Sequence, residues 1–439
     1  MKFTSLTCFA VLVLGTLTSA APTGQRKTQN YLIQLNKDAA VDDFIPKFIK
    51  DTTKLFGDLF EEVGEKSNSV VDQANDPMGN SNIRVLKSFD LAGNFKALDV
   101  SLADNRIVEK ILKSFSEVVT VVPNEVIQFH LPKPASHNTN SKRADSYLEQ
   151  ANPGWSLSRI SQRELDLTQP YIYDSRGGSG VTVYVVDDGC NVDHNDFGGR
   201  ATHGYSAYGD EDPVEGGGHG THVSGIIGGS EYGVAKNVSI VSVKVLSAEG
   251  SGSLSDVIGG IEYVVNQEKG KNRPVVVNMS LGAPKSGSGS DTLNDAITAA
   301  VEAGVPIVVA AGNDASDACE MVPAGNENVF TVGSVNKEDT LDDFSCYGSC
   351  VNILAPGRDI TSAYIGGKDT EETMSGTSMA SPHVAGVAAL LLPGLEQGIA
   401  PKDLYSAVAK ITTNDKIGAI PDSATPNQLL FNGQQKTEQ

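Results

Sequence analysis

The stretch Val181-Thr182-Val183-Tyr184-Val185-Val186-Asp187-Asp188-Gly189 decides the fold class of this chain. Its apolar, largely β-branched residues run without polar alternation, which is typical of a parallel strand buried on both faces. Further buried strands are predicted near residues 239–246, 274–279, 305–311 and 329–334, and helices near 254–267, 291–303 and 378–392. This alternation predicts an α/β fold in which helices cover both faces of a parallel sheet.

Two further segments carry side chains that can act with the carboxylate at the end of this strand. Gly216-Gly217-Gly218 delivers His219 to the start of a small apolar helix, and Ser378 precedes Pro382 in a second apolar segment. Proline fits only the first turns of a helix, so Ser378 should lie at a helix N-terminus, where developing negative charge is favoured. Serine needs a neighbouring base, histidine supplies one near neutral pH, and a buried carboxylate orients its ring. Asp187, His219 and Ser378 therefore predict attack of a hydroxyl on a carbonyl.

With these motifs the chain resembles the subtilisin-like serine proteases, most closely the proteinase K and cerevisin branch of fungal enzymes. The resemblance covers nearly the whole chain. It implies a serine endopeptidase in which Asp187 orients, His219 is the general base and acid, and Ser378 is the nucleophile. Asn313, at the end of Ala310-Ala311-Gly312-Asn313, corresponds to the family's side-chain donor to the oxyanion, and the backbone N–H of Ser378 would be the other donor.

The resemblance also implies where an extended peptide would bind by adding a strand to an exposed edge. One edge is expected at Gly250, Ser251 and Gly252, and the other at Ser280, Leu281 and Gly282. Ser280-Leu281-Gly282 and Ala310-Ala311-Gly312 resemble the two walls of the pocket for the side chain before the cut. These open, apolar walls predict a broad preference for apolar or aromatic residues. Asp188 resembles the second carboxylate of the kexin D-D-G motif, so it is expected beside the second residue before the cut.

Residues 21–143 are predicted to precede a catalytic domain that spans 144–433. Between about 30 and 130 the pattern predicts a small α+β ferredoxin-like domain with βαββαβ order: strand 31–35, helix 41–60, strands 84–86 and 95–100, helix 105–115 and strand 118–128. The pattern alone is also typical of a free-standing binding module, whereas the resemblance implies an inhibitory propeptide that aids folding. The linker 131–143 ends in Lys142-Arg143, so the mature chain should start near Ala144.

Residues 1–20 combine a basic start, an apolar centre and a small-residue end, the features of a secretory signal peptide. We expect a secreted enzyme, with the vacuole as an alternative destination. Residues 434–439 are expected to form a polar tail. Asn237 begins a glycosylation sequon in a predicted loop, whereas the sequon at Asn278 ends a buried strand and is expected to stay unmodified.

Four cysteines remain once Cys8 leaves with the signal peptide, an even number for an oxidising compartment. Three pairings are open from the residues alone. The resemblance favours Cys319–Cys350. Cys190 and Cys346 would then either pair or leave Cys190 as a thiol near Asp187.

The net charge of −20 argues against nucleic acid as a partner, and no later apolar run is long enough to span a membrane. We expect a monomer whose partners are peptide or protein substrates and its own propeptide. No metal-spaced histidine cluster is present, so no cofactor or metal ligand is assigned. Structural calcium is common in the family and stays open, without ligands. A carboxylate ligand of proteinase K corresponds to Asn352, and an amide weakens such a site.

Three other functions compete with this interpretation. A dinucleotide-binding enzyme is disfavoured because Gly216-Gly217-Gly218 lacks the G-x-G-x-x-G spacing after a strand. An inactive binding protein would be expected to lack one of the four catalytic residues, and all four are present. A kexin-like processing protease with a preference for basic residues is the nearest alternative. Asp187-Asp188-Gly189 favours it, whereas Met379 after Ser378 and the sequence context of Asn313 argue against it.

Overall fold

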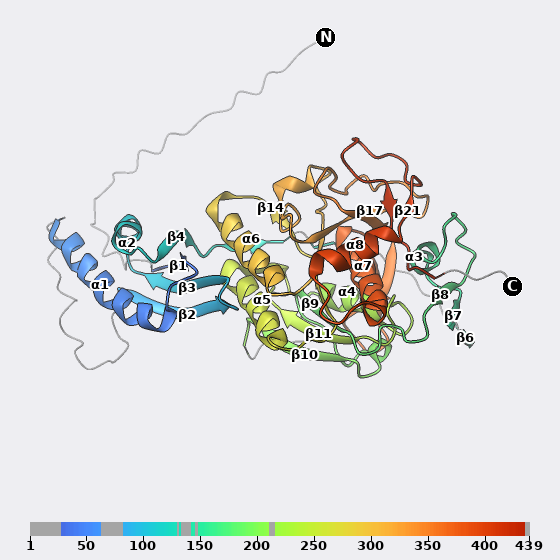
Figure 1. The fold of residues 1–439 in the computed structure, drawn as a ribbon, viewed down its shortest axis with the longest axis horizontal. Helices are drawn as coiled ribbons and strands as arrows, with labels where there is room; N and C mark the ends of the chain where they lie inside the picture. The colour runs from blue at the N-terminus through green and yellow to red at the C-terminus, as the bar shows by residue number, and fades with distance from the viewer. Residues whose placement is uncertain are drawn as a thin grey trace, which may run out of the picture.

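The computed structural model describes residues 28–62, 82–129, 131–132, 142–144, 148–209 and 216–434. The predicted signal peptide, most of the predicted linker and residues 435–439 lie outside this part of the chain. Two units lie side by side, a small N-terminal one and a larger one that contains the main sheet (Figure 1). Within the described part, no helix is both long enough and apolar enough to cross a membrane.

The larger unit is built around a nine-stranded sheet whose strands are parallel except for the last pair. The order of its strands is β10 (Ala201–Ser206), β11 (Ser239–Lys244), β9 (Thr182–Asp187), β13 (Val275–Met279), β15 (Ile307–Ala310), β17 (Phe330–Val335), β18 (Ile353–Pro356), β22 (Gln428–Leu429) and β21 (Thr413–Asn414). The predicted parallel sheet is confirmed. Its outer strands β10, β21 and β22, and the inner strand β18, were not predicted.

Helices cover both faces of this sheet, as the sequence predicts (Figure 1). One layer contains α3 (Trp155–Ile160), α4 (His219–Gly228), α7 (Thr377–Leu391) and α8 (Pro401–Lys410), and the other contains α5 (Leu254–Glu268) and α6 (Gly287–Glu302). In β9, Val183 and Val185 pack with the first layer, whereas Tyr184 and Val186 pack with the second. Alternate side chains of an apolar strand thus enter two separate cores.

Short strands pair around the rim of the larger unit. They are β6 (Lys142–Ala144) with β7 (Leu148–Ala151) and β8 (Tyr171–Tyr173), β14 (Ala283–Pro284) with β16 (Met321–Val322), and β19 (Ile360–Ala363) with β20 (Glu371–Met374). The predicted maturation site at Arg143 therefore lies in an edge strand rather than in an unpaired linker. Single 3-10 turns are formed by Asn105–Ile107, Asn195–Phe197, Ala318–Glu320 and Leu392–Gly394.

The N-terminal unit has the predicted βαββαβ order. Its elements are β1 (Gln29–Leu35), α1 (Val41–Glu62), β2 (Ile83–Leu91), β3 (Phe95–Leu102), α2 (Val108–Ser114) and β4 (Val118–Pro123), and its antiparallel sheet has the order β2-β3-β1-β4. Leu98 and Val100 pack toward α1 and α2, whereas Phe95 and Ala97 belong to the core that contains α5 and α6. The sheet therefore lies between its own helices and the larger unit (Figure 1).

The predicted strand 118–128 is divided into two strands that belong to different sheets. β4 ends at Pro123, which has no N–H to continue a ladder. The Asn124 amide then contacts the other unit, because its Oδ1 accepts from Ser255 N at 3.1 Å and its Nδ2 donates to Ser255 Oγ at 2.8 Å. β5 (Val126–Gln128) follows and pairs with β12 (Ser251–Ser253) of the larger unit.

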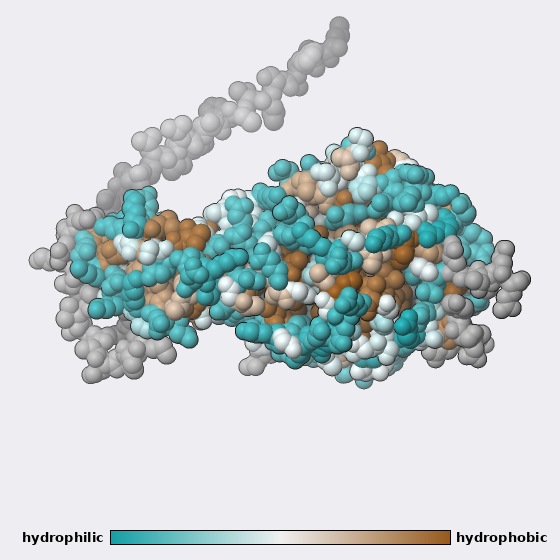
Figure 2. Space-filling view, viewed as in Figure 1, coloured by the Kyte–Doolittle hydropathy of each residue, from teal (hydrophilic) through white to brown (hydrophobic). Residues whose placement is uncertain are grey.

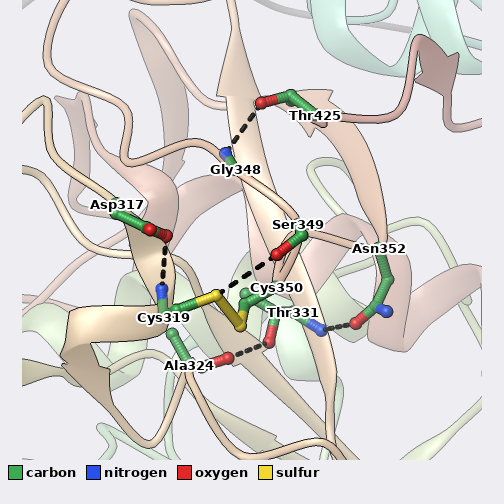
Figure 3. The surroundings of a disulfide bond; sticks show 9 residues. All are labelled: Asp317, Cys319, Ala324, Thr331, Gly348, Ser349, Cys350, Asn352 and Thr425. Atoms are coloured by element: carbon green, nitrogen blue, oxygen red, sulfur yellow. Dashed lines mark hydrogen bonds between the residues drawn. A yellow bond between two sulfur atoms is a disulfide. The ribbon is translucent and has the colours of Figure 1, made fainter. Parts of the chain in front are cut away.

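The disulfide Cys319–Cys350 is present, with Cα atoms 5.3 Å apart, as the resemblance implied (Figure 3). Cys190 and Cys346 are free, buried thiols, so the alternative in which they pair is wrong. On the side of the molecule shown in Figure 2, the surface is mostly hydrophilic and hydrophobic residues appear in separate patches.

Candidate active site

The four residues predicted to act in catalysis lie at or just beyond the ends of two strands and two helices. Asp187 is the last residue of β9, and His219 is the first residue of α4. Ser378 is the second residue of α7, as predicted from Pro382. Asn313 follows β15, which lies beside β13 in the sheet. Because α4 and α7 pack against each other, the carboxyl ends of parallel strands and two helix N-termini meet in one place.

Asp187 and His219 form the closest polar contact of the site. Asp187 Oδ1 lies 2.7 Å from His219 Nδ1 and also accepts from Asp188 N at 2.8 Å. Both side chains are almost fully buried. No hydrogen-bond partner is present for His219 Nε2, which is equally buried. Because Asp187 can only accept, the neutral imidazole of His219 has its proton on Nδ1. Its Nε2 is therefore the basic nitrogen.

Ser378 does not hydrogen-bond to His219 in this structure. Its Oγ donates to the carbonyl oxygen of Ser280 at 3.1 Å, and Ser280 Oγ donates to the Ser378 carbonyl at 2.8 Å. These two bonds fix the start of α7 to the segment Ser280–Gly282, which was predicted to bind substrate. The Ser378 hydroxyl must rotate before it can meet Nε2.

Asn313 is held by the residue before Ser378. Its Oδ1 accepts from Thr377 N at 2.8 Å and from Thr377 Oγ1 at 3.0 Å, and Thr377 Oγ1 in turn accepts from Gly312 N at 3.1 Å. The carbonyl end of the amide is therefore directed at the start of α7. These contacts do not use the Nδ2 of Asn313, so this nitrogen can donate a hydrogen bond to another group.

Three histidines near the site differ in their electrostatics. Burial opposes charge on His219, but the charge of Asp187, the hydrogen bond that His219 donates to Asp187 and the charge of Asp188 raise the pKa of His219. Burial lowers the pKa of His222 to about 3, and its Nε2 donates to the carbonyls of Ile360 and Glu372 at 3.0 Å. Burial likewise lowers the pKa of His383 to about 4. Of these three histidines, only His219 combines a raised pKa with a direct contact to a buried carboxylate.

A short segment of the N-terminal unit lies along the predicted substrate edge. β5 pairs antiparallel with β12, which includes the predicted binding residues Ser251 and Gly252. Phe129 N then donates to the Gly250 carbonyl at 3.0 Å. A Cβ on Gly250 would lie 2.9 Å from Leu131 Cδ1, and a Cβ on Gly376 would lie 2.6 Å from Pro132 Cγ. The chain therefore passes from the Gly250 edge to the residue two before Ser378.

A small pocket adjoins Ser378 on the other side. It is lined by predicted residues Gly282, Ala310, Gly312 and Asn313, together with Asp314, Met321, Thr377 and Ser378. Met321 was missed, because it comes from the short strand β16 and no motif surrounds it. Ser280, Leu281 and Ala311, which the sequence analysis placed around this pocket, are buried and do not line it.

Asp188 does not lie where the sequence analysis expected it. Its carboxylate is 0% exposed and accepts from Gly220 N at 2.7 Å and from His219 N at 3.2 Å. It is thus turned toward the backbone of α4 and away from the groove. The expectation came from the kexin motif, which does not report the direction of the side chain.

The amide at the position of one family calcium ligand is already engaged in the main sheet. Asn352 Oδ1 accepts from Thr331 N at 2.7 Å, so the amide that replaces a carboxylate ligand is already used by β17 (Figure 3). No group of three or more His, Cys, Asp or Glu residues in the described ranges could hold a metal ion. We therefore assign no step to a metal.

Comparison with known proteins identifies the family. The model of the Subtilase family, Peptidase S8, matches residues 178–425. The chain is 47% identical to the subtilisin-like serine protease Rho m 2.0101 of Rhodotorula mucilaginosa, over 64% of this chain and 85% of that protein. It is 44% identical to alkaline protease 2 of Aspergillus fumigatus over 66% of this chain, and 42% identical to cerevisin of Saccharomyces cerevisiae over 66%. The matches span 62% and 48% of those two proteins.

Among solved structures, a cold adapted subtilisin-like serine proteinase matches with a TM-score of 0.58 and 44% identity, over 64% of this chain and 98% of that one. The extent of the family match and the identity of the relatives place the chain in the subtilase family. It is a subtilisin-like serine protease with an α/β fold.

Proposed function

We propose that the chain is a secretory-pathway serine endopeptidase that cleaves peptide bonds through an acyl-enzyme, with Asp187, His219 and Ser378 as its triad. The observation that carries this proposal is the 2.7 Å contact between Asp187 Oδ1 and His219 Nδ1, at the start of the helix that packs against the helix of Ser378. Because Nδ1 is engaged, Nε2 is the atom that receives the Ser378 proton.

The reaction follows from these positions. Ser378 Oγ bonds to the scissile carbonyl carbon as its proton moves to His219 Nε2, and the carbonyl oxygen becomes an anion. This anion accepts from Asn313 Nδ2 and from Ser378 N, which lies in the first turn of α7 where no intrahelical acceptor exists. The imidazolium then gives its proton to the leaving nitrogen as the C–N bond breaks. A water molecule then attacks the ester carbon while His219 takes one of its protons. The bond to Ser378 Oγ breaks as His219 returns that proton to Oγ, and the acid product leaves.

A broad preference for apolar or aromatic side chains before the cut belongs to the same proposal. Gly282, Ala310, Gly312 and Met321 supply the small or apolar part of the walls beside Ser378. The kexin-like alternative loses its main support, since the buried Asp188 is bound to the backbone of α4. The peptide backbone would pair with β12 on one side and with Ser280–Gly282 on the other.

The test of the triad is loss of hydrolysis in Ser378→Ala and in His219→Ala, measured on peptide amide and ester substrates. Ser375→Ala is the matched control, because Ser375 Oγ contacts Asp359 N on the outer side of the same segment. A serine-directed fluorophosphonate should label the native enzyme at Ser378 alone. Labelling at another serine together with loss of activity would contradict the assignment.

Residues 21–143 act in this proposal as an inhibitory propeptide. Two features support the role: β5 and Phe129 use the backbone edge that a substrate would use, and the unit has its own core around Phe48, Ile107 and Leu98. The segment 21–143 added to mature enzyme should inhibit it at micromolar concentration. A segment that ends at Asn124 is the matched control and should inhibit much less. Equal inhibition by both would exclude occupation of the groove as the cause.

Secretion and maturation belong to the same proposal. Residues 1–20 would direct the chain into the secretory pathway, and the mature chain would begin near Ala144. Asn237 is exposed and could carry a glycan, whereas Asn278 is fully buried. N-terminal sequencing and intact mass of the product test all three points, since each glycan and each cut changes the mass.

A further inference from the structure

The buried carboxylate of Asp188 has no role in the mechanism described above, yet it lies against the general base. Oδ1 accepts from Gly220 N at 2.7 Å and Oδ2 accepts from His219 N at 3.2 Å. These N–H groups are the first two of α4, and neither has an acceptor within the helix. A charged acceptor at this position is favoured by the helix dipole as well as by the hydrogen bonds.

The glycine-rich loop is packed around this carboxylate. A Cβ on Gly217 would lie 2.3 Å from the Ala248 carbonyl oxygen and 3.0 Å from Asp188 Oδ2. A Cβ on Gly220 would lie 2.1 Å from the Gly189 carbonyl oxygen and 3.0 Å from Asp188 Oδ1. Any larger residue at either position would displace the carboxylate or the loop. Glycine at these two positions therefore lets the backbone pass close to neighbouring carbonyls and also leaves room for the Asp188 carboxylate.

A buried cation fixes the main chain on the other side. Lys244, at the end of β11, is 1% exposed, and its Nζ donates to the Asp188 carbonyl at 2.7 Å and to the Leu246 carbonyl at 2.8 Å. Asp188 is thus held by its main chain at β11 and holds α4 by its side chain. The position of His219 depends on both contacts.

We propose that Asp188 is a positioning residue for His219: its carboxylate fixes the first turn of α4, which directs the imidazole at Asp187, and its negative charge stabilises the imidazolium formed in the reaction. This inference rests on the proposed role of His219 as the base. It adds a second carboxylate, bound to the backbone of the histidine rather than to its ring, to the three residues of the triad.

The charges around Asp188 define how the site should respond to pH. The titratable groups that face it are Asp187, Cys190, His219, Lys244 and Tyr364. Burial and the charge of Asp187 raise the pKa of Asp188, whereas His219 and Lys244 oppose the rise. The ionised carboxylate in turn contributes to the raised pKa of His219. Loss of this charge should therefore lower the pKa of His219 and move the acid limb of activity to lower pH.

The experiment compares the kinetics of Asp188→Asn and Asp188→Ser with those of the native enzyme. The concentration of active enzyme in each preparation is first determined by active-site titration. The control is Asp193→Asn, which removes the same charge from an exposed position in the same loop. We expect kcat of the Asp188 variants to fall by about tenfold with KM within about twofold, since a small displacement of the base affects the chemical step. The acid limb of kcat/KM should move down by about half a unit to one unit, while the control should match the native enzyme.

A variant that does not mature is studied as the uncut full-length chain with Ser378→Ala, which removes any need for self-cleavage. NMR titration of labelled His219 should give a lower pKa in Ser378→Ala/Asp188→Asn than in Ser378→Ala alone. Unchanged kcat and an unchanged acid limb in the mature enzyme, or identical titrations in the uncut chain, would overturn the inference. Hydrolysis that survives His219→Ala would instead overturn the proposed function, so the two failures are distinguishable.

Discussion

Two helices begin at the active site, and their first N–H groups are satisfied in different ways. At α4, the charged Asp188 accepts from His219 N and Gly220 N. At α7, the neutral amide of Asn313 accepts from Thr377 N. Both side chains cap a helix, but only the first brings a negative charge.

The difference matches the charge that each helix start must stabilise in the proposed reaction. His219, on α4, becomes positive, so a carboxylate beneath it is favourable. The oxygen bound near Ser378, on α7, becomes negative, so a carboxylate there would oppose it. In the proposed reaction, the residue suited to cap each helix thus depends on two properties. It must accept hydrogen bonds from the first N–H groups, and its charge must suit the charge that develops there in the transition state.

The largest fall in kcat should follow when the amide at the start of α7 is replaced by a carboxylate, like the one at the start of α4. Asn313→Asp preserves shape but replaces a donor with a negative charge, so kcat should fall by about 10³-fold or more. Steady-state kinetics on a peptide amide, corrected for active sites, measures it.

Asn313→Ala is the reference for that experiment. It removes the donor without adding charge, and kcat should fall by about 10²–10³-fold, the loss found when one such donor is removed from subtilisin. Equal losses in the two variants would show that charge at this helix start is unimportant. A change confined to KM would mean that Asn313 only shapes its loop.

A smaller effect is expected when the Asn313 side chain loses one of the two hydrogen bonds that hold it. Thr377→Val removes the Oγ1 contact with Asn313 Oδ1 but preserves the one from Thr377 N, so kcat should fall by about tenfold. Thr373→Val is a matched control, because Thr373 Oγ1 pairs with Thr361 on the rim strands β19 and β20. Full activity in Thr377→Val would show that the backbone contact alone positions Asn313.

The pH profile separates the two caps. The pKa of His219 is raised, so the base is available above this raised value and is lost as pH falls through it. The acid limb of kcat/KM should therefore lie above the ordinary value for histidine. Asn313→Ala should lower the plateau and leave the limb in place, because a neutral side chain adds no charge to the ring. A shifted limb in Asn313→Ala would contradict this division of roles.

The smallest expected effect is on specificity. Because Asp188 is fully buried, the ratio of kcat/KM for substrates with Lys and with Ala at the second position before the cut should be the same in the native enzyme and in Asp188→Thr. A few-fold loss of preference for Lys in the variant, reduced by added salt, would instead place the carboxylate within reach of substrate.

Sequence patterns predicted the parts of the fold that repeat a simple physical rule. Apolar runs such as the one in Thr182–Asp187 are central strands in the structure. A strand that is buried on both faces of a sheet needs apolar residues at every position, so it shows no alternation with polar ones. Ser378 was placed at a helix start because Pro382 cannot lie deep in a helix without losing a backbone bond. Both predictions use information within a few residues.

The errors concern contacts made between distant segments. Asp188 was expected in the groove, but its carboxylate accepts from the N–H groups of His219 and Gly220, about thirty residues away in the chain. Residues 118–128 read as one strand, although β5 pairs with β12. Met321 lines the pocket through a two-residue strand that has no periodicity.

The pairing of β5 with β12 makes occupation of the groove a matter of concentration. If residues 21–143 act as the proposed propeptide, β5 competes with substrates as a tethered ligand for as long as the bond before Ala144 is intact, at an effective concentration on the order of millimolar. Few external peptides reach such a level. Once the tether is cut, the same strand becomes a separate molecule whose local concentration falls with every dilution. A single hydrolysed bond would thus convert a site blocked at any dilution into one that opens as the protein leaves the compartment where it was made.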